Sequence, residues 1–358
     1  MRVCIIGSGL SGLTLAKALV NKKINVDVIK SKKVFEYSKS RTLGISKSNI
    51  KFINENIINI EKIIWKLKKI EIFTENLKNE KLLEFESRKR ELFSIVKNYK
   101  LYEILYKSLS KNKFYKEINR KKTLDLNNSY NLIINTDVNH IFMNKFFNKK
   151  IIKKYYSFAH TTIITHKKID NNVASQIFTK QGPLAFLPIS NSETSIVYSI
   201  YNSKRIDIEN IKNLIYKHNF KYEIINIKEI KSFELKSLSL RSYYYKNILA
   251  FGDLLHQIHP LAGQGFNMTI RDIRVLIKVI IKRLNLGLDL DASTNIEFEK
   301  KIKHKNFIFE NGIDFIYEFF NVESKLKNNI LSKSVQLIGR NPSLNKLFTK
   351  IADEGILF

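Results

Sequence analysis

The first residues of the chain join a short strand to a helix through closely spaced glycines. Met1 to Ile6 predicts a strand, Gly7-Ser8-Gly9-Leu10-Ser11-Gly12 follows it directly, and the apolar spacing of residues 13–20 predicts a helix. In this context Gly7 permits the tight turn, Gly9 lets the backbone approach a pyrophosphate, and Gly12 allows close packing of helix on strand. The segment predicts a Rossmann-like dinucleotide-binding unit; a tight turn without a nucleotide is the alternative.

A second strand-to-helix corner spans residues 252–267. The apolar run 248–251 predicts a buried strand, and the apolar spacing from Met268 to Arg283 predicts a helix. Between them, Asp253 can hold a ligand hydroxyl, while Gly263 and Gly265 let backbone N–H groups approach a planar, electron-accepting ring. The helix dipole would stabilise negative charge on that ring. The alternative is a helix N-cap at Asp253 and a glycine loop without a ligand.

Together the two corners resemble those of the flavoprotein aromatic-ring monooxygenases related to para-hydroxybenzoate hydroxylase, and more closely the FAD-dependent hydroxylases of ubiquinone biosynthesis. In the latter, a Gly-Asp-x-x-His-x-x-His-Pro-Leu-Ala-Gly-Gln-Gly-x-Asn segment is typical, and residues 252–267 match it almost residue for residue. Residues 41–46, 182–189 and 195–198, together with Arg271-Asp272, extend the resemblance over essentially the whole chain.

The resemblance implies FAD as the cofactor. Asp253 would bind the ribityl hydroxyls, the backbone at 263–266 would face the isoalloxazine ring, Pro260 would lie against that ring, and Arg41 would reach the cofactor. His256 and His259 are expected to fix the loop by hydrogen bonding, so no catalytic base is assigned. The implied cofactor-binding residues are Gly7, Ser8, Gly9, Leu10, Ser11, Gly12, Arg41, Asp253, Pro260, Gly263, Gln264, Gly265, Phe266 and Asn267.

Three positions depart from the family pattern. Dinucleotide sites usually place a carboxylate about 20 residues after the glycines to bind the adenosine ribose, but the strand 24–29 ends at Lys30. A cation there indicates a 2′-phosphate partner or a lost ribose contact; the second is expected, because FAD has no 2′-phosphate. Val138 replaces the glycine of an Asp-Gly motif after Asp137, and Tyr99 replaces an arginine. Despite these departures FAD binding is still expected, whereas efficient reduction by NAD(P)H no longer follows from the pattern.

The order of strand and helix signals predicts an α/β fold in which two units are interleaved. The expected FAD-binding domain comprises residues 1–69, 87–150 and 246–290, the mixed-sheet substrate domain comprises 70–86 and 151–245, and a helical C-terminal region covers 291–358. Strands are expected at 70–74, 81–85, 161–165, 184–189 and 195–201, and helices at 101–109 and 208–216. The tail carries an aromatic stripe that predicts core packing, with a membrane contact as the alternative: Phe307, Phe309, Phe315, Phe319 and Phe320.

Composition bounds the class of protein. The chain has 358 residues, of which 44% are hydrophobic, and no apolar stretch is long enough to span a bilayer. Cys4 is the only cysteine, which excludes an intramolecular disulfide. Because Met1 to Ile6 leads straight into the glycine turn, no signal peptide is expected, and a cytoplasmic location is predicted, with a peripheral position at the inner face of the membrane as a variant.

The formal net charge of +29 arises from 62 Lys and Arg against 33 Asp and Glu. The basic runs are scattered and no nucleic-acid module accompanies them, so a nucleic-acid partner is not expected. Because Lys, Ile and Asn are abundant along the whole chain, much of the charge is interpreted as compositional background. Attraction to an anionic membrane surface is favoured over nucleic acid, because a polyprenylated substrate would require that proximity.

The expected function is FAD-dependent hydroxylation of the aromatic ring of a polyprenylated phenol in ubiquinone biosynthesis, using O₂ and NAD(P)H or another reductant. The chain has no second nucleotide fingerprint, so NAD(P)H would visit transiently. No Cys or His pair has metal-ligand spacing, so no metal is expected. Two alternatives stay open: a flavin oxidoreductase acting on an isoprenoid, and a degenerate non-catalytic member of a ubiquinone-biosynthesis assembly.

Overall fold

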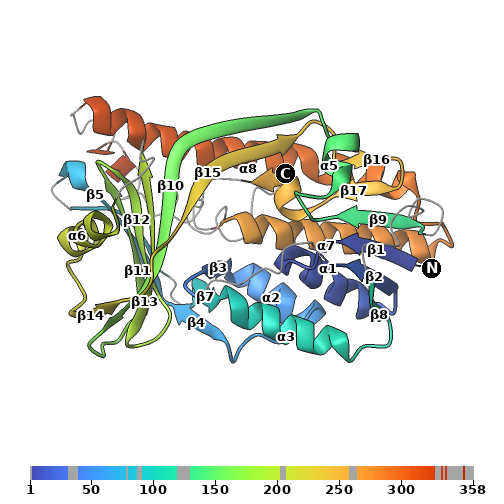
Figure 1. Cartoon of the computed structure of the whole chain (residues 1–358), viewed down its shortest axis with the longest axis horizontal. Helices are drawn as coiled ribbons and strands as arrows, with labels where there is room; N and C mark the ends of the chain where they lie inside the picture. Colours follow the sequence, from blue (N-terminus) through green and yellow to red (C-terminus); the bar gives the residue numbers. More distant parts are fainter. Residues whose placement is uncertain are drawn as a thin grey trace.

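The computed structural model describes residues 2–30, 39–77, 80–86, 91–118, 130–201, 207–257, 264–326, 332–333, 335–336 and 350. Two large sheets lie side by side, and helices α7 (Gln264–Asn285) and α8 (Ala292–Leu326) run along the molecule (Figure 1). The predicted α/β class with a helical C-terminal region is confirmed.

The first sheet brings the two glycine corners to one edge. Its strand order is β16-β17-β9-β1-β2-β8, and all neighbours are parallel except β16 and β17. Because parallel strands end at the same edge, Gly7 after β1 and Gly252 after β17 lie at that edge together. The strands are β1 (Arg2–Ile6), β2 (Asn25–Ile29), β8 (Tyr115–Ile118), β9 (Leu132–Asn135), β16 (Tyr244–Tyr245) and β17 (Ile248–Ala250).

Burial on both faces explains why these strands are apolar throughout. Residues 3–6 and 132–134 are at most 1% exposed, as expected for the centre of a parallel sheet. Helix α1 (Leu10–Val20) connects β1 to β2 and packs against α3 (Asn98–Ser110), within which the predicted helix 101–109 falls. A small antiparallel sheet of β3 (Thr42–Ser46), β7 (Phe93–Lys97) and β4 (Ile64–Leu67) lies beside α2 (Lys47–Asn56).

The second sheet is mixed, as predicted. Its order is β18-β15-β10-β13-β12-β11-β5-β6, with β14 paired to β10, and only the β11–β5 pair is parallel among the pairs that the structure describes. Helix α6 (Ile208–His218) covers one face through Ile211 and Ile215. The strands are β5 (Lys69–Thr74), β6 (Lys81–Glu86), β10 (Lys150–His166), β11 (Val173–Thr179), β12 (Gly182–Pro188), β13 (Glu193–Tyr201), β14 (Ile224–Ile227), β15 (Lys231–Leu240) and β18 (His256–Gln257).

Strand β10 is much longer than the predicted strand 161–165. Its first half pairs with β15 and curves over the top of the molecule in Figure 1. The alternation of apolar and polar residues in this half is interrupted by three lysines, Lys150, Lys153 and Lys154. The sequence pattern therefore did not predict this part of the strand. The interleaving is visible in β5 and β6, which join the second sheet between elements of the nucleotide side; the domain boundaries themselves stay a prediction.

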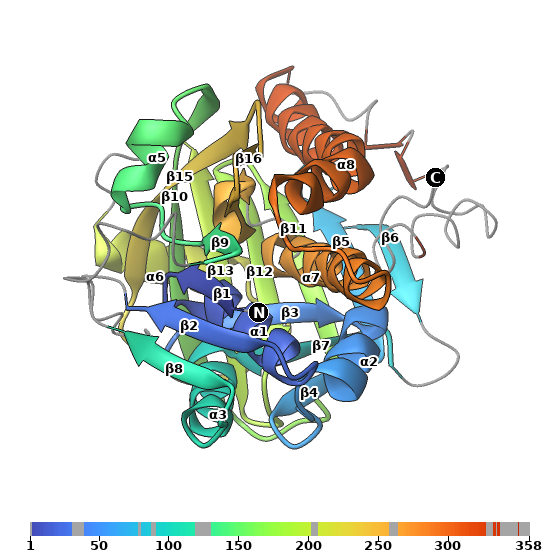
Figure 2. The same ribbon diagram turned by 90° about the vertical axis from the view of Figure 1, so that its right-hand side faces the viewer.

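The C-terminal helices pack on each other, and α7 also contacts α1; Figure 2 shows α7 and α8 to the right of the first sheet. The prediction that the aromatic stripe packs in the core is right for Phe309 and Phe319, which pack against a buried cluster, and wrong for Phe307 and Phe315, which are 63% and 68% exposed. The side chain of Phe320 lies outside the described residues. Within the described part of the chain, every helix is too short or too polar to cross a bilayer.

Candidate functional site

The two glycine corners meet in space. Gly252 has a φ of +68°, and a Cβ atom placed on it would lie 2.9 Å from the Cβ of Ser11 and 3.0 Å from its Oγ. The start of the second corner therefore packs directly on the first turn of α1. Helix α1 also contacts α7, so both helices begin beside the same edge of the sheet. Two helix N-termini at one place favour the binding of anionic groups.

The three glycines of the first corner have different surroundings. Gly7 has a φ of +109° and donates its N–H to the carbonyl of Ile29 at 2.9 Å. A Cβ at Gly12 would lie 2.2 Å from the carbonyl oxygen of Gly7, whereas a Cβ at Gly9 would meet no atom of the described residues within 4 Å. Gly7 and Gly12 are thus required by the turn and by packing. Gly9 faces open space, as a backbone that approaches a pyrophosphate must.

The second corner presents Asp253 to solvent and buries the start of α7. Asp253 is exposed in the short 3-10 turn η3 (Gly252–Leu254). Gln264 is 6% exposed, and its Oε1 has no hydrogen-bond partner among the described residues. Gly265 has open space where a side chain would be, and Phe266 is buried. Pro260 and Gly263, together with His259, lie outside the described residues.

Asn267 performs a structural task that the sequence did not predict. Its side chain is completely buried, and its Nδ2 donates to the carbonyl of Gly44 at 2.9 Å. Its Oδ1 accepts from the backbone N–H of Ser46 and from Nδ2 of Asn49, both at 2.9 Å. The Asn267 side chain therefore joins α7 to β3 and α2. Only the backbone of Asn267 is left for the predicted contact with the cofactor.

Arg41 lies between the start of β3 and strand β15. Its guanidinium carbon is 5.4 Å from the ring centre of Phe233 on β15, and its carbonyl accepts from the N–H of Asn98 at 3.0 Å. The next residue, Thr42, forms a 2.9 Å hydroxyl–hydroxyl hydrogen bond with Ser195 of β13. Arg41 is exposed and thus available to a ligand.

A buried polar cluster lies behind the second corner. His256 is 1% exposed, and its Nε2 is 2.6 Å from Oδ2 of Asp272 on α7. Asn306 of α8 donates to the same carboxylate at 3.5 Å, and Glu310 of α8 lies close enough to interact with both charges. Burial opposes charge on the imidazole, but Asp272 raises the pKa of His256; burial raises the pKa of Glu310 to about 7. The loop is thus fixed by His256, the residue expected to do so.

Of the positions that depart from the family pattern, Lys30 is engaged with the protein and Val138 is exposed. Lys30 forms an ion pair with Glu117 of β8 at 2.6 Å. Asp137 is 7% exposed, and its carboxylate accepts from the N–H of Asn139 at 2.9 Å, so it holds a turn. Val138 beside it is 49% exposed. The sequence missed Glu117, Asp272 and Glu310 as functional candidates, and only the Arg271-Asp272 pair gave a signal for any of them.

The site fits a flavin dinucleotide. Among the described residues, Gly9 and Gly265 have open space where a side chain would be, the buried Oε1 of Gln264 has no partner, and Asp253 is exposed. These groups lie at or near the N-termini of α1 and α7, which contact each other. The donors are backbone N–H groups, the acceptors are a carboxylate and an amide oxygen, and these suit phosphates, ribityl hydroxyls and a ring with polar edges.

Comparison with known proteins agrees with this geometry. Residues 178–287 match the model of an FAD binding domain. Ubiquinone biosynthesis monooxygenase COQ6 of Drosophila melanogaster is 23% identical over 425 residues, covering 97% of this chain and 88% of that protein. The 3-demethoxyubiquinol 3-hydroxylase of Escherichia coli is 27% identical over 177 residues, which cover 46% of this chain and 45% of that enzyme.

Solved structures share the fold. HpxO of Klebsiella pneumoniae, complexed with FAD and uric acid, has a TM-score of 0.75 at 13% identity and covers 99% of this chain and 97% of that one. PqsL of Pseudomonas aeruginosa, a probable FAD-dependent monooxygenase, has a TM-score of 0.69 at 15% identity, with coverage of 94% and 99%. The two glycine corners that meet are thus accompanied by a match to an FAD binding domain and by similarity to a monooxygenase of ubiquinone biosynthesis and to a demethoxyubiquinol hydroxylase.

Proposed function

We propose that this protein hydroxylates the aromatic ring of a polyprenylated phenol in ubiquinone biosynthesis, with FAD as cofactor and O₂ as oxygen source. The observation that carries the proposal is the contact between Ser11 and Gly252, which joins the dinucleotide corner to the Gly-Asp corner. Bound FAD supplies the redox chemistry that activates O₂. The protein must hold the cofactor, orient the phenol and exclude water.

Each predicted binding residue has a proposed task. The N–H groups of residues 8–12 at the start of α1 bind the pyrophosphate, with Gly9 allowing the close approach. Asp253 accepts hydrogen bonds from the ribityl hydroxyls, Arg41 reaches the cofactor from β3, and the backbone of 263–266 meets the isoalloxazine ring. Pro260, which lies outside the described residues, would pack against that ring. The N-terminus of α7 would favour the negatively charged form of a reduced cofactor.

The second sheet offers a suitable wall for an uncharged ring. In β12 and β13, Phe186, Ile196 and Tyr198 pack in the cluster shared with α6. Because side chains alternate along a strand, Ala185, Ser195 and Val197 lie on the opposite face. The hydrogen bond between the hydroxyls of Thr42 and Ser195 orients this face toward β3. Small, uncharged side chains there favour a neutral phenol.

The proposal includes a peripheral position at a membrane. On α8 and on β10, large apolar side chains face solvent next to lysines; Phe307, Phe315, Ile151 and Tyr156 are 57–68% exposed. Aromatic and aliphatic side chains interspersed with Lys are suited to the boundary of an anionic bilayer. Such a position would give the site access to a prenylated substrate. Membership in a ubiquinone-biosynthesis protein assembly is a second proposal for the same surface.

A second candidate is a member of the fold that NAD(P)H does not reduce, as exposed Val138 and the turn-holding Asp137 suggest. One experiment separates the candidates. The purified protein is examined by absorption spectroscopy and then mixed anaerobically with NADH or NADPH. A hydroxylase is yellow, is bleached by the reductant or by a reductase partner, and under ¹⁸O₂ gives a product with one labelled oxygen. A colourless protein would refute the proposal, and an oxidised product without added oxygen would favour an isoprenoid oxidoreductase.

A further inference from the structure

Lys30 stands where a dinucleotide site usually has its ribose-binding carboxylate. It follows Ile29, the last residue of β2, and the carbonyl of Ile29 accepts the N–H of Gly7. The Lys30 position is therefore directly beside the glycine corner. A ligand whose pyrophosphate lies at that corner would place its adenosine ribose near the end of β2.

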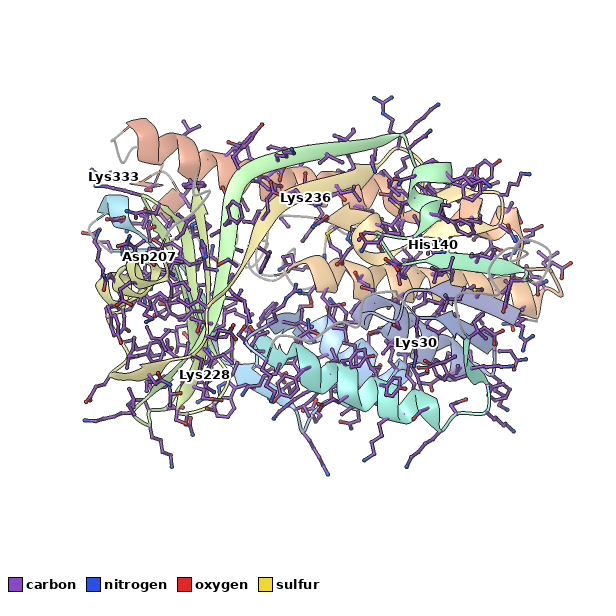
Figure 3. The ribbon with its side chains drawn as sticks, in the orientation of Figure 1. Lys30, His140, Asp207, Lys228, Lys236 and Lys333 are labelled. Atoms are coloured by element: carbon purple, nitrogen blue, oxygen red, sulfur yellow. The ribbon has the colours of Figure 1, made fainter. Side chains whose placement is uncertain are left out.

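Lys30 forms an ion pair with a carboxylate, Glu117, that lies on the neighbouring strand β8. Its Nζ is 2.6 Å from Oε2 of Glu117, and Glu117 lies on β8, opposite Val28 in the parallel ladder. The same Nζ is 6.0 Å from the ring centre of Tyr106 on α3, so Lys30 lies between the sheet and that helix (Figure 3). The hydrogen bond to Glu117 raises the pKa of Lys30, which keeps the lysine charged.

Glu117 keeps capacity to accept further hydrogen bonds. The hydroxyl of Tyr115 donates to Oε1 at 3.1 Å, and Lys30 occupies one position at Oε2. An ionised carboxylate has about four acceptor positions, so two remain for a ligand. The side chain of Glu117 is 24% exposed, which lets a ligand reach it.

We infer that the Lys30–Glu117 pair is the adenosine-ribose subsite of this protein, in which Glu117 supplies from β8 the carboxylate that β2 lacks. Glu117 accepts hydrogen bonds from the ribose hydroxyls, and Lys30 acts as a positioning residue that holds the carboxylate at the end of β2. A 2′-phosphate is disfavoured, because it would lie against the Glu117 carboxylate and compete with it for Lys30. The inference rests on the proposed cofactor site.

Binding to the apoprotein tests the inference without measuring turnover. FAD, ADP-ribose and FMN are titrated into wild-type protein, Glu117→Gln and the matched control Glu103→Gln, whose side chain is exposed on α3. Glu117→Gln is expected to lower the affinity for FAD and for ADP-ribose about tenfold, which is the effect of losing one hydrogen bond to a charged group. The affinity for FMN should not change, because FMN has no adenosine. The exchange Lys30→Glu with Glu117→Lys returns the carboxylate to β2 and should restore the affinity for both ligands.

The outcomes separate this inference from the proposed function. Unchanged affinity of Glu117→Gln for ADP-ribose overturns the inference even if the protein binds FAD. Tighter binding of 2′-phospho-ADP-ribose than of ADP-ribose also overturns it, because Lys30 would then be a phosphate partner. If wild-type protein binds ADP-ribose in a Glu117-dependent way but does not bind FAD, the proposed function fails and the subsite stands.

Discussion

Asp253 and His256 are three residues apart in one loop, yet their surroundings are opposite. Asp253 faces solvent at the start of the second corner, whereas His256 is buried against Asp272 and α8. The first is free to bind a ligand, and the second fixes the loop from behind. A substitution at Asp253 should therefore change binding, while one at His256 should change stability first.

Replacing Asp253 by Ala should remove the proposed hydrogen bonds to the ribityl hydroxyls. We expect FAD affinity to fall by about tenfold or more, since a hydrogen bond to a charged group contributes about 1.5–3 kcal/mol, with little change in thermal stability. Fluorescence titration of apoprotein measures the affinity. Asp289→Ala, at an exposed position after α7, is the control and should bind FAD as wild type does. Equal FAD content in both variants would move the ribityl contact away from Asp253.

Glu310→Gln should make the stability of the folded protein less dependent on pH. The groups that face Glu310 are His256, Asp272, Asp314, Ser239 and Tyr243. Its folded-state pKa of about 7 exceeds the ordinary value of 4.5, so the folded state holds a proton that the unfolded state releases. Stability should therefore fall as pH rises from 4.5 to about 7 and then level off.

The pKa of His256 is also raised in the folded state, so protonated His256 stabilises the fold. This contribution to stability is lost as the pH rises through the folded-state pKa of His256, as it is for Glu310. Thermal unfolding between pH 5 and 8.5 should show a smaller loss of stability in Glu310→Gln than in wild type. Glu55→Gln, in an exposed pair with Lys51 on α2, should behave as wild type. An unchanged pH dependence in Glu310→Gln would show that the residue does not titrate in this range.

At the scale of elements, two glycines at the corner between β1 and α1 have different roles: Gly12 is required for packing, and Gly9 is proposed to admit the pyrophosphate. A Cβ at Gly12 would overlap the Gly7 carbonyl, but one at Gly9 would enter open space at an ordinary extended backbone conformation. Gly9→Ala should fold with normal thermal stability and lose FAD affinity, because the methyl group occupies the pyrophosphate position. Gly12→Ala should lose thermal stability as well. If Gly9→Ala binds FAD normally, the pyrophosphate does not lie at this corner.

The outer face of α8 gives a prediction about membranes. Wild-type protein should sediment with vesicles that contain phosphatidylglycerol, and high salt should release it, because basic side chains contribute about 1 kcal/mol each near an anionic surface. The double variant Phe307→Ser with Phe315→Ser should bind these vesicles more weakly at any salt concentration. Tyr216→Ser, half exposed on α6, is the matched control. Equal sedimentation of all three proteins would place the contact elsewhere.

At the scale of the molecule, what the sequence could predict was local. Strand, glycines and helix are contiguous at residues 1–20 and again at 248–283, so short-range patterns were sufficient for both corners. Glu117, Glu310 and Asn306 acquire their roles only when β8 pairs with β2 or α8 packs on α7. Asn267 looked like a ligand contact, because a motif does not show that its side chain would bond to β3 and α2 instead.

The small antiparallel sheet is also joined to the second large sheet across their boundary. Besides Thr42 and Ser195, Lys97 of β7 forms a 2.8 Å ion pair with Glu193 of β13. The pattern of either strand alone gives no hint of this pairing, since Lys and Glu are common on exposed faces. These contacts set the spacing between the cofactor side and the wall of the proposed substrate site.

The meeting of Ser11 with Gly252 also has a consequence for biosynthesis. A ribosome must release most of the polypeptide before these residues can touch, so the coenzyme can be captured only late in translation. Prematurely terminated products would contain the first glycine corner and α1 but would lack the second corner, which is proposed to bind the flavin. Cells short of riboflavin would then accumulate a complete but empty chain, which is more exposed to proteases than the loaded form because bound ligand stabilises the folded state.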